Sequence, residues 1–429
     1  MRCAVWLFIA ATWLVSACAP RTPEPTPTPV PSPTPIPTPT ATAAPTQTPT
    51  PTRVPREACP PPDPNAAWIA PPDFGGYPGA IGSFLDAGGS ADALRAILTN
   101  ASSIGAQFGG VWSFDLTGDG APETIVSIYD PLGQVYGPVP TGLLLVYRCA
   151  DQLALLLYHD AGPPMPQVAR MADLVGAGRG GEIAVVHSDC GAHTCFDTLD
   201  VLGWDGAGFV SLMGDRLQMP HPTYAFVDLD GDPALEIQAV SGQIASAGAG
   251  PQRTATETWD WNGSQYVKVA ESISPPEYRI HVVHDADDLL LRGDVADAIE
   301  LYNRVIGDEM LRDWLLEIGV ERPNDRANLT AYAWYRIVMA KVRLGDVASA
   351  QAAFDRLSAD FPAGAPGHEY QELAQIFWSK YQESNSLSVA CLAANAHANN
   401  ETDVLDGLNA FGYANRQYVA QDMCPFVGP

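Results

Sequence analysis

The pattern of apolar and polar positions changes several times along the chain of 429 residues. Apolar residues fill positions 3–17 almost without a break, and large apolar residues then nearly disappear between positions 19 and 56. From about residue 108 to 275, short apolar–polar alternations are separated by acidic or Gly-containing turns, which predicts β-strands. From about residue 285 the apolar residues recur at a helical spacing. The pattern predicts a multidomain protein, with a β-rich repeat domain ahead of an α-helical domain.

The first apolar run has the length of a signal-peptide core and is too short to span a bilayer comfortably. It follows Met1 and Arg2 and ends in Leu14-Val15-Ser16-Ala17-Cys18. This ending resembles the lipobox of bacterial lipoproteins, which implies cleavage before Cys18 and acylation of that residue. We therefore expect a signal peptide over residues 1–17 and a cell-membrane lipid anchor at Cys18, facing the extracytoplasmic side. The alternative is an ordinary signal peptide in which Cys18 has no role.

A stretch rich in Pro and Thr covers residues 18–57. Its composition supplies no apolar core, and its prolines favour extended polyproline II. We expect a disordered, lipid-anchored stalk that holds the folded domains away from the membrane. Residues 58–107 then form an N-terminal segment with a helix, predicted over residues 80–101.

The β-rich domain, residues 108–275, repeats one pattern three times: an acidic loop, a strand, and an aromatic residue about 32 positions further on. The units open at Asp115, Asp173 and Asp228 and reach their aromatic residue at Tyr147, Trp204 and Trp261. In the last two units this residue opens an Asp-Gly or Asn-Gly turn, which indicates a hairpin. Each unit is thus predicted to contain four short strands. The units resemble FG-GAP and related calcium-loop repeats, which implies a partial β-propeller-like domain. The resemblance does not decide whether the three units close into a ring, because a closed propeller usually needs more units.

The resemblance implies a site for Ca²⁺ in the first and third loops. A D-x-D-x-D-G-x-x-D loop offers side-chain oxygens at positions one, three, five and nine and a carbonyl at position seven, and such hard ligands suit Ca²⁺. The implied side-chain ligands are Asp115, Thr117, Asp119 and Glu123 in the first loop, and Asp228, Asp230, Asp232 and Glu236 in the third. The implied carbonyls belong to Ala121 and Ala234. Glu replaces Asp at position nine in both loops, Pro233 replaces the turn glycine in the third, and the alternative is that these loops are solvated turns.

The second loop retains only Asp173 of the acidic pattern, and we expect it to be metal-free. Its Gly176-x-Gly178-x-x-Gly181 matches a dinucleotide-binding fingerprint, but that motif requires a following helix. A strand is predicted there instead, which argues against nucleotide binding.

Two stretches of the C-terminal region, residues 288–302 and 334–354, each predict a pair of helices separated by a Gly-Asp turn. The second stretch has Trp334, Ala350, Phe354 and Pro362 at spacings that resemble a tetratricopeptide repeat. The resemblance implies a helical solenoid over residues 276–429, with an insertion near residues 307–325, and a concave face for a protein partner. The alternative is a plain helical bundle.

Six cysteines follow Cys18, and an even number in an exported protein suggests disulfides. The pairs that we predict are Cys59–Cys149, Cys190–Cys195 and Cys391–Cys424. A zinc site is the alternative, although no C-x-x-C pair is present. The net charge of −26 argues against a nucleic-acid partner.

No catalytic motif appears in the sequence, so we do not expect an enzyme. His281-x-x-His284 stands just ahead of a predicted helix and is assigned a surface or capping role. The expected function is a non-enzymatic, surface-tethered binding or scaffold lipoprotein with calcium-stabilised β-repeats and a helical protein-interaction module. The alternative is a cell-wall or polysaccharide-binding protein or hydrolase that stacks a glycan on Trp112, Trp204, Trp259 and Trp261, although core packing explains these tryptophans more simply.

Overall fold

A computed structural model describes residues 60–133, 135–136, 139–149, 153–159, 165–178, 180–191, 194–246, 248–321 and 323–427. The chain divides into two compact units, Met1–Thr52 and Arg53–Pro429, and all described residues belong to the second. The predicted signal peptide, Cys18, the stalk and Cys59 lie outside the described residues. Within the described part, no helix is long and apolar enough to cross a bilayer.

Two helices precede the sheets, where the sequence predicted one. Helix α1 (Tyr77–Asp86) follows a short 3-10 turn, η1 (Phe74–Gly76), and helix α2 (Ala91–Asn100) comes next. The prediction of a single helix was wrong because Gly88 adopts a φ of +88°, which turns the chain between them. Ser90 caps the start of α2, because its hydroxyl accepts a hydrogen bond from the Ala93 N–H at 3.2 Å.

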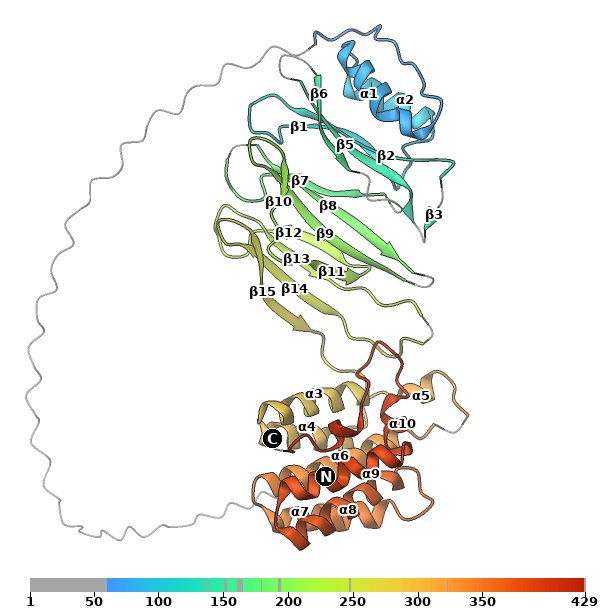
Figure 1. The fold of residues 1–429 in the computed structure, drawn as a ribbon, viewed down its shortest axis with the longest axis vertical. Coiled ribbons are helices and arrows are strands. Elements are labelled where there is room, and N and C mark those ends of the chain that lie inside the picture. The colour runs from blue at the N-terminus through green and yellow to red at the C-terminus, as the bar shows by residue number, and fades with distance from the viewer. Residues whose placement is uncertain are drawn as a thin grey trace, which may run out of the picture. The chain divides into compact units, whose positions relative to one another are not determined.

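Three antiparallel sheets follow in chain order (Figure 1). The first sheet has the order β1-β2-β5-β6, the second β10-β9-β8-β7 with β11 paired to β9, and the third β12-β13-β14-β15. Strands β3 and β4 form a separate two-stranded ribbon. The bounds are β1 Gly110–Phe114, β2 Glu123–Tyr129, β3 Val135–Tyr136, β4 Val139–Pro140, β5 Gly142–Cys149, β6 Leu153–His159, β7 Gln167–Ala172, β8 Glu182–Cys190, β9 Cys195–Trp204, β10 Phe209–Ser211, β11 Leu217–Pro220, β12 Thr223–Val227, β13 Glu236–Val240, β14 Ala255–Trp261 and β15 Tyr266–Ile273.

Both predicted hairpin turns are confirmed. Strand β9 ends at Trp204 and pairs in register with Phe209 of β10, and Trp261 of β14 pairs in the same way with Tyr266 of β15. In the first of these turns the Asp205 carboxylate accepts hydrogen bonds from two backbone N–H groups two and three residues later. The Asp-Gly and Asn-Gly signals therefore located the hairpins correctly.

The sheets pack face to face, because alternate residues of a strand point to opposite faces. Val126 of β2 packs with helices α1 and α2, whereas its neighbour Ile125 packs with the second sheet. In the same way, Val185 of β8 faces the first sheet and Ala184 faces the third. The helices α1 and α2 thus cover one face of the first sheet. Its other face packs against the second sheet, which in turn packs against the third.

The helical region begins at Arg279. Its helices are α3 (Arg279–Arg292), α4 (Val295–Gly307), α5 (Trp314–Glu317), α6 (Asp325–Arg343), α7 (Val347–Asp360), α8 (His368–Ser384), α9 (Leu387–Asn400) and α10 (Asp403–Asn409), followed by a 3-10 turn, η2 (Ala420–Met423). The predicted breaks at Gly293 and Gly345 are confirmed, and both glycines have positive φ. Helix α5 lies in the predicted insertion.

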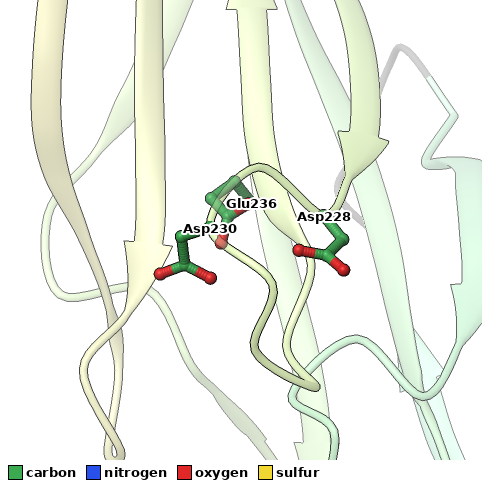
Figure 2. Close-up of side chains that lie close together, drawn as sticks. All are labelled: Asp228, Asp230 and Glu236. Carbon is green, nitrogen blue, oxygen red and sulfur yellow. The ribbon is translucent and has the colours of Figure 1, made fainter.

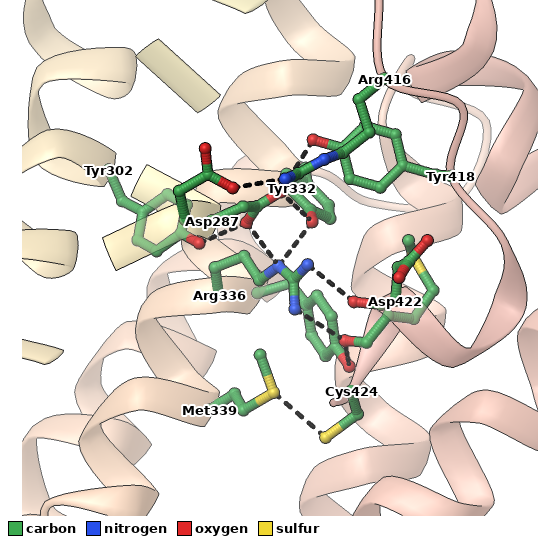
Figure 3. A network of polar contacts seen from close by, with 12 residues as sticks. Asp287, Tyr302, Tyr332, Arg336, Met339, Arg416, Tyr418, Asp422 and Cys424 are labelled. Atoms are coloured by element: carbon green, nitrogen blue, oxygen red, sulfur yellow. Dashed lines mark hydrogen bonds and ion pairs between the residues drawn. The ribbon is translucent and has the colours of Figure 1, made fainter. Parts of the chain in front are cut away.

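A buried ion pair lies in the core of the helical region (Figure 3). Asp287 of α3 and Arg336 of α6 are 3.1 Å apart and both are buried. The Asp287 carboxylate also accepts hydrogen bonds from the hydroxyls of Tyr302, Tyr332 and Tyr418. Burial raises the pKa of all three tyrosines well above the ordinary value, so their hydroxyls keep the protons that they donate. The buried charge of Asp287 is therefore fully compensated.

The C-terminal segment packs back on these helices. Arg336 donates hydrogen bonds to the carbonyl oxygens of Asp422 and Met423, at 2.7 and 3.1 Å. The disulfide Cys391–Cys424 joins α9 to the same segment, which confirms that predicted pair. The segment thereby belongs to the core of the helical region.

Candidate metal centre

The three acidic loops have the same place in their sheets. Each loop connects the first strand of its sheet in chain order to the second. The loop that opens at Asp115, for example, connects β1 to β2. The loops also lie against one another: a side chain at Gly180 would meet the backbone of Gly118, and one at Gly176 would meet Pro233. Pro233 therefore stands where the third loop contacts the second, and its closeness leaves no room for a side chain at Gly176.

Each loop is closed by a glutamate at the start of the next strand. The Glu123 carboxylate accepts the backbone N–H groups of Leu116 and Thr117, at 2.7 and 3.1 Å. Glu182 accepts the N–H groups of Leu174 and Val175 in the same way. Burial raises the pKa of Glu123 and Glu182, although these N–H donors oppose the rise. Position nine thus has a structural role in the first two loops.

In the first loop a guanidinium contacts two of the predicted ligands. Arg148 of β5 forms an ion pair with Asp119 at 2.6 Å and lies 4.0 Å from Glu123. The Thr117 hydroxyl donates to Glu123 at 3.0 Å, and Asp115 accepts the N–H of Gly118 at 2.7 Å. The four predicted ligands of this loop do not form a metal-ligating group in the described structure. Arg148 already places one positive charge beside two of its acidic side chains.

Sequence reasoning missed Arg148, although a signal was present. Tyr147, Trp204 and Trp261 occupy equivalent positions of the three units, and the residues after them are Arg148, Asp205 and Asn262. Only the first unit places a cation directly after its aromatic residue, at the end of the strand that pairs with β2.

The second loop forms a turn closed by its own side chain. Asp173 accepts the N–H groups of Ala177 and Gly178 at 2.9 and 2.8 Å. The strand predicted after Gly181 is confirmed as β8.

The third loop brings three of its four predicted ligands together (Figure 2). One carboxylate oxygen each of Asp228, Asp230 and Glu236 lies within 4.8 Å of the others. Asp232 is not in this group, and its carboxylate accepts the N–H of Ala234 at 2.7 Å. Among the described residues, this is the only cluster of at least three His, Cys, Asp or Glu side chains with metal-ligating spacing.

Glu236 differs from its two counterparts in what its second oxygen contacts. One oxygen accepts the N–H of Leu229, as in the other loops. The other, Oε1, is buried and has no hydrogen-bond partner in the described structure, although Glu236 is only 3% exposed. No Lys or Arg of the described part pairs with the third loop as Arg148 pairs with the first. A buried oxygen without a partner is costly, and a cation bound beside Asp228 and Asp230 would remove that cost.

The remaining predicted sites are placed as follows. The Cys190–Cys195 disulfide is confirmed and closes the hairpin between β8 and β9. Cys149 is disulfide-bonded, and its predicted partner Cys59 lies outside the described residues. Trp259 is buried between the second and third sheets, so a role as an exposed stacking platform does not hold for it.

The surface or capping role expected for His281 and His284 was wrong. Both lie inside α3, and His281 is buried. The helix begins earlier than the periodicity indicated, because Tyr278 and Arg279 are anchored to the segment around Arg312 and Asp313.

Comparisons with protein-family models, with curated proteins and with solved structures find no match for this chain.

Proposed function

We propose that this chain is a non-enzymatic, surface-tethered binding or scaffold protein whose β-region is stabilised by Ca²⁺ in the third loop. The observation that carries the proposal is the Asp228, Asp230 and Glu236 triad with its unpartnered buried oxygen. These side chains would hold the ion, and Ca²⁺ would supply charge neutralisation and a rigid link across the loop. The three loops recur along the sequence in a pattern that resembles FG-GAP repeats, and this supports the proposal that the sheets are related to the blades of a β-propeller.

The helical region is proposed to bind a protein partner as a tetratricopeptide-like module. Supporting this, α3 with α4 and α6 with α7 form helix pairs that turn at Gly-Asp, with Ala298 and Ala350 fully buried on the second helix of each pair. Small residues at such positions allow helices to pack closely, as stacked helical repeats require.

The calcium proposal is tested by melting the full chain in EDTA and in millimolar Ca²⁺. A site held at one hundred times its dissociation constant adds about 2.7 kcal/mol, which raises the midpoint by roughly 3–8 °C in a unit of this size. Asp230→Asn should abolish this rise, and Asp232→Asn should retain it. The two variants are matched, because each side chain accepts one backbone N–H that an amide oxygen also accepts. Equal midpoints of the wild-type protein in EDTA and Ca²⁺ would refute the site.

The tether is proposed at Cys18, on the lipobox-like sequence that precedes the Pro/Thr-rich stretch. Cys18→Ser should move the protein from the membrane fraction to the soluble fraction, because attachment rests on the acyl chains alone. Cys3→Ser is the matched control, since it changes a cysteine inside the predicted signal peptide and should leave the protein with membranes. Full membrane retention of Cys18→Ser would show that the anchor lies elsewhere.

A further inference from the structure

Two histidines lie where the third sheet meets the helical region. His281 and His284 are one turn apart on α3, and their ring centroids are 6.4 Å apart. Both line a groove together with Arg253, from the loop between β13 and β14, and with Arg416, from the C-terminal segment. The two imidazoles therefore face two parts of the chain that are far from α3 in the sequence.

Polar contacts of the loop between β13 and β14 make this junction. The Nε2 atom of His281 lies 3.2 Å from the carbonyl oxygen of Pro251, and Asn415 donates to the same oxygen at 3.0 Å. Two backbone N–H groups of the C-terminal segment also donate to carbonyls of the loop, Tyr413 to Gly248 at 3.0 Å and Ala414 to Ala249 at 3.1 Å. The loop is thus tied to α3 through a histidine and to the C-terminal segment through its backbone.

Neither imidazole can become charged without leaving a buried N–H unpaired. A carbonyl only accepts, so His281 donates to Pro251 from Nε2, and a second proton would go to Nδ1. The charged form of His284 carries a proton on Nε2. Both of these nitrogens, Nδ1 of His281 and Nε2 of His284, are buried and have no hydrogen-bond partner in the described structure. A buried donor without an acceptor is costly, and opening the junction removes that cost.

The charged groups around the two rings are already paired with one another. Each nearby carboxylate has an arginine: Asp285 pairs with Arg253 at 2.6 Å, Asp287 with Arg336 at 3.1 Å, Glu277 with Arg312 at 3.0 Å, and Asp288 with Arg416. The rings of Tyr278 and Tyr418 also contact the histidines, and burial raises the pKa of both hydroxyls, which keeps them uncharged. An imidazolium would therefore add a positive charge beside carboxylates that already have a cation.

The effect of pH follows from the difference between the closed and the open junction. Burial lowers the pKa of both imidazoles, that of His284 to about 4. An exposed imidazole has a pKa of about 6.5. Between these two values the closed junction binds fewer protons than the open one. Its stability is therefore complete above about pH 6.5 and falls as the pH falls toward 4.

We propose that this junction is an acid-sensitive joint, in which protonation of His281 and His284 releases the loop between β13 and β14 from α3 and from the C-terminal segment. The third sheet then separates from the helical region, while the core of the helical region stays folded. The joint does not involve the ligands of the third acidic loop and does not depend on Ca²⁺.

The test measures amide hydrogen exchange of the full chain by mass spectrometry at pH 7.5 and at pH 5, corrected for the intrinsic exchange rate. The N–H groups of Tyr413 and Ala414 report on the joint, because they donate to the loop. Protonation of His284 alone should lower their protection about 20-fold between the two pH values. Amides inside α6 should keep their protection.

His284→Phe removes one titrating group, and its Nε2 has no hydrogen bond to lose in the described structure. This variant should reduce the loss of protection, and the double variant with His281→Phe should abolish it. His397→Phe is the matched control, because His397 lies on α9 and does not line the groove, so it should behave as the wild type. Protection of the α6 amides at pH 7.5 shows whether each variant is folded.

Three results would each overturn the proposal. The first is equal protection of Tyr413 and Ala414 at the two pH values in the wild-type protein. The second is a loss in His284→Phe or in the double variant as large as that of the wild type, which would assign the effect to carboxylates. The third is a parallel loss of protection in α6, which would mean that the helical region unfolds as a whole.

Discussion

At the residue scale, the buried carboxylate of Asp287 gathers polar contacts from several parts of the helical region. Asp287 receives three tyrosine hydroxyls and the guanidinium of Arg336, and these groups come from α4, α6 and the C-terminal segment. Because the charge of Asp287 balances that of Arg336, removing one without the other leaves a buried charge uncompensated.

Asp287→Asn should therefore destabilise the protein by about 3–5 kcal/mol. Tyr418→Phe removes one hydroxyl that donates to the same carboxylate and should cost about 1.5–3 kcal/mol. Denaturant unfolding of both variants measures the two free energies. A loss for Asp287→Asn no greater than that for Tyr418→Phe would show that the ion pair contributes little.

Individual residues of the loops were predicted to different extents. The sequence identified Asp228, Asp230 and Glu236 because the loop pattern places their oxygens a few positions apart. It missed Arg148, because this residue lies 29 positions from Asp119 and reaches it only through the pairing of β5 with β2. Local spacing is visible in a sequence, whereas the contact of a strand with a distant loop depends on the assembled sheet.

At the element scale, one leucine follows the opening aspartate in each acidic loop. Leu116 and Leu174 are 2% and 0% exposed, because each inserts into the core shared with the next sheet. Leu229 is 53% exposed. On the same face of the third sheet stand Gln238 and Thr258, which pair across β13 and β14. The third sheet thus has a polar outer face, as expected of the last repeat of a stack.

This difference in burial predicts that the same substitution, Leu to Ala, destabilises the protein much more at one position than at the other. Leu174→Ala should cost about 3–4 kcal/mol, because it leaves a cavity between two sheets. Leu229→Ala, at the equivalent position, should change stability by about 0.5 kcal/mol or less. Denaturant unfolding of the two variants provides the comparison. Similar losses in both would mean that another structure covers Leu229.

The elements themselves were largely predictable. Alternation and turn residues located the strands that flank each loop and both terminal hairpins, and Gly-Asp pairs located two helix turns. The extra helix near Gly88 and the early start of α3 were missed, because a glycine with positive φ and contacts with distant residues set those boundaries. Apolar periodicity carries neither piece of information.

At the scale of the whole molecule, contacts between regions far apart in the sequence lay beyond prediction. Asn415 donates to the carbonyl of Pro251, and Tyr413 donates its N–H to the carbonyl of Gly248. These bonds join the C-terminal segment to the loop between β13 and β14. The order of a β-rich part followed by a helical part was correctly predicted, since composition and periodicity change between them. The contacts at this junction emerged only from the fold.

A comparison of the three loops predicts how many Ca²⁺ ions the whole chain binds. The first loop holds the guanidinium of Arg148, the second lacks inner carboxylates, and among the described residues only the third gathers three carboxylate oxygens without a paired Lys or Arg. Calorimetric titration of the full chain with Ca²⁺ in a chelator-free buffer tests this most directly. We predict one binding site per chain, no binding heat for Glu236→Gln, and a second site for Arg148→Gln. No binding heat in the wild-type protein, or two or three sites per chain, would contradict the assignment of Ca²⁺ to the third loop.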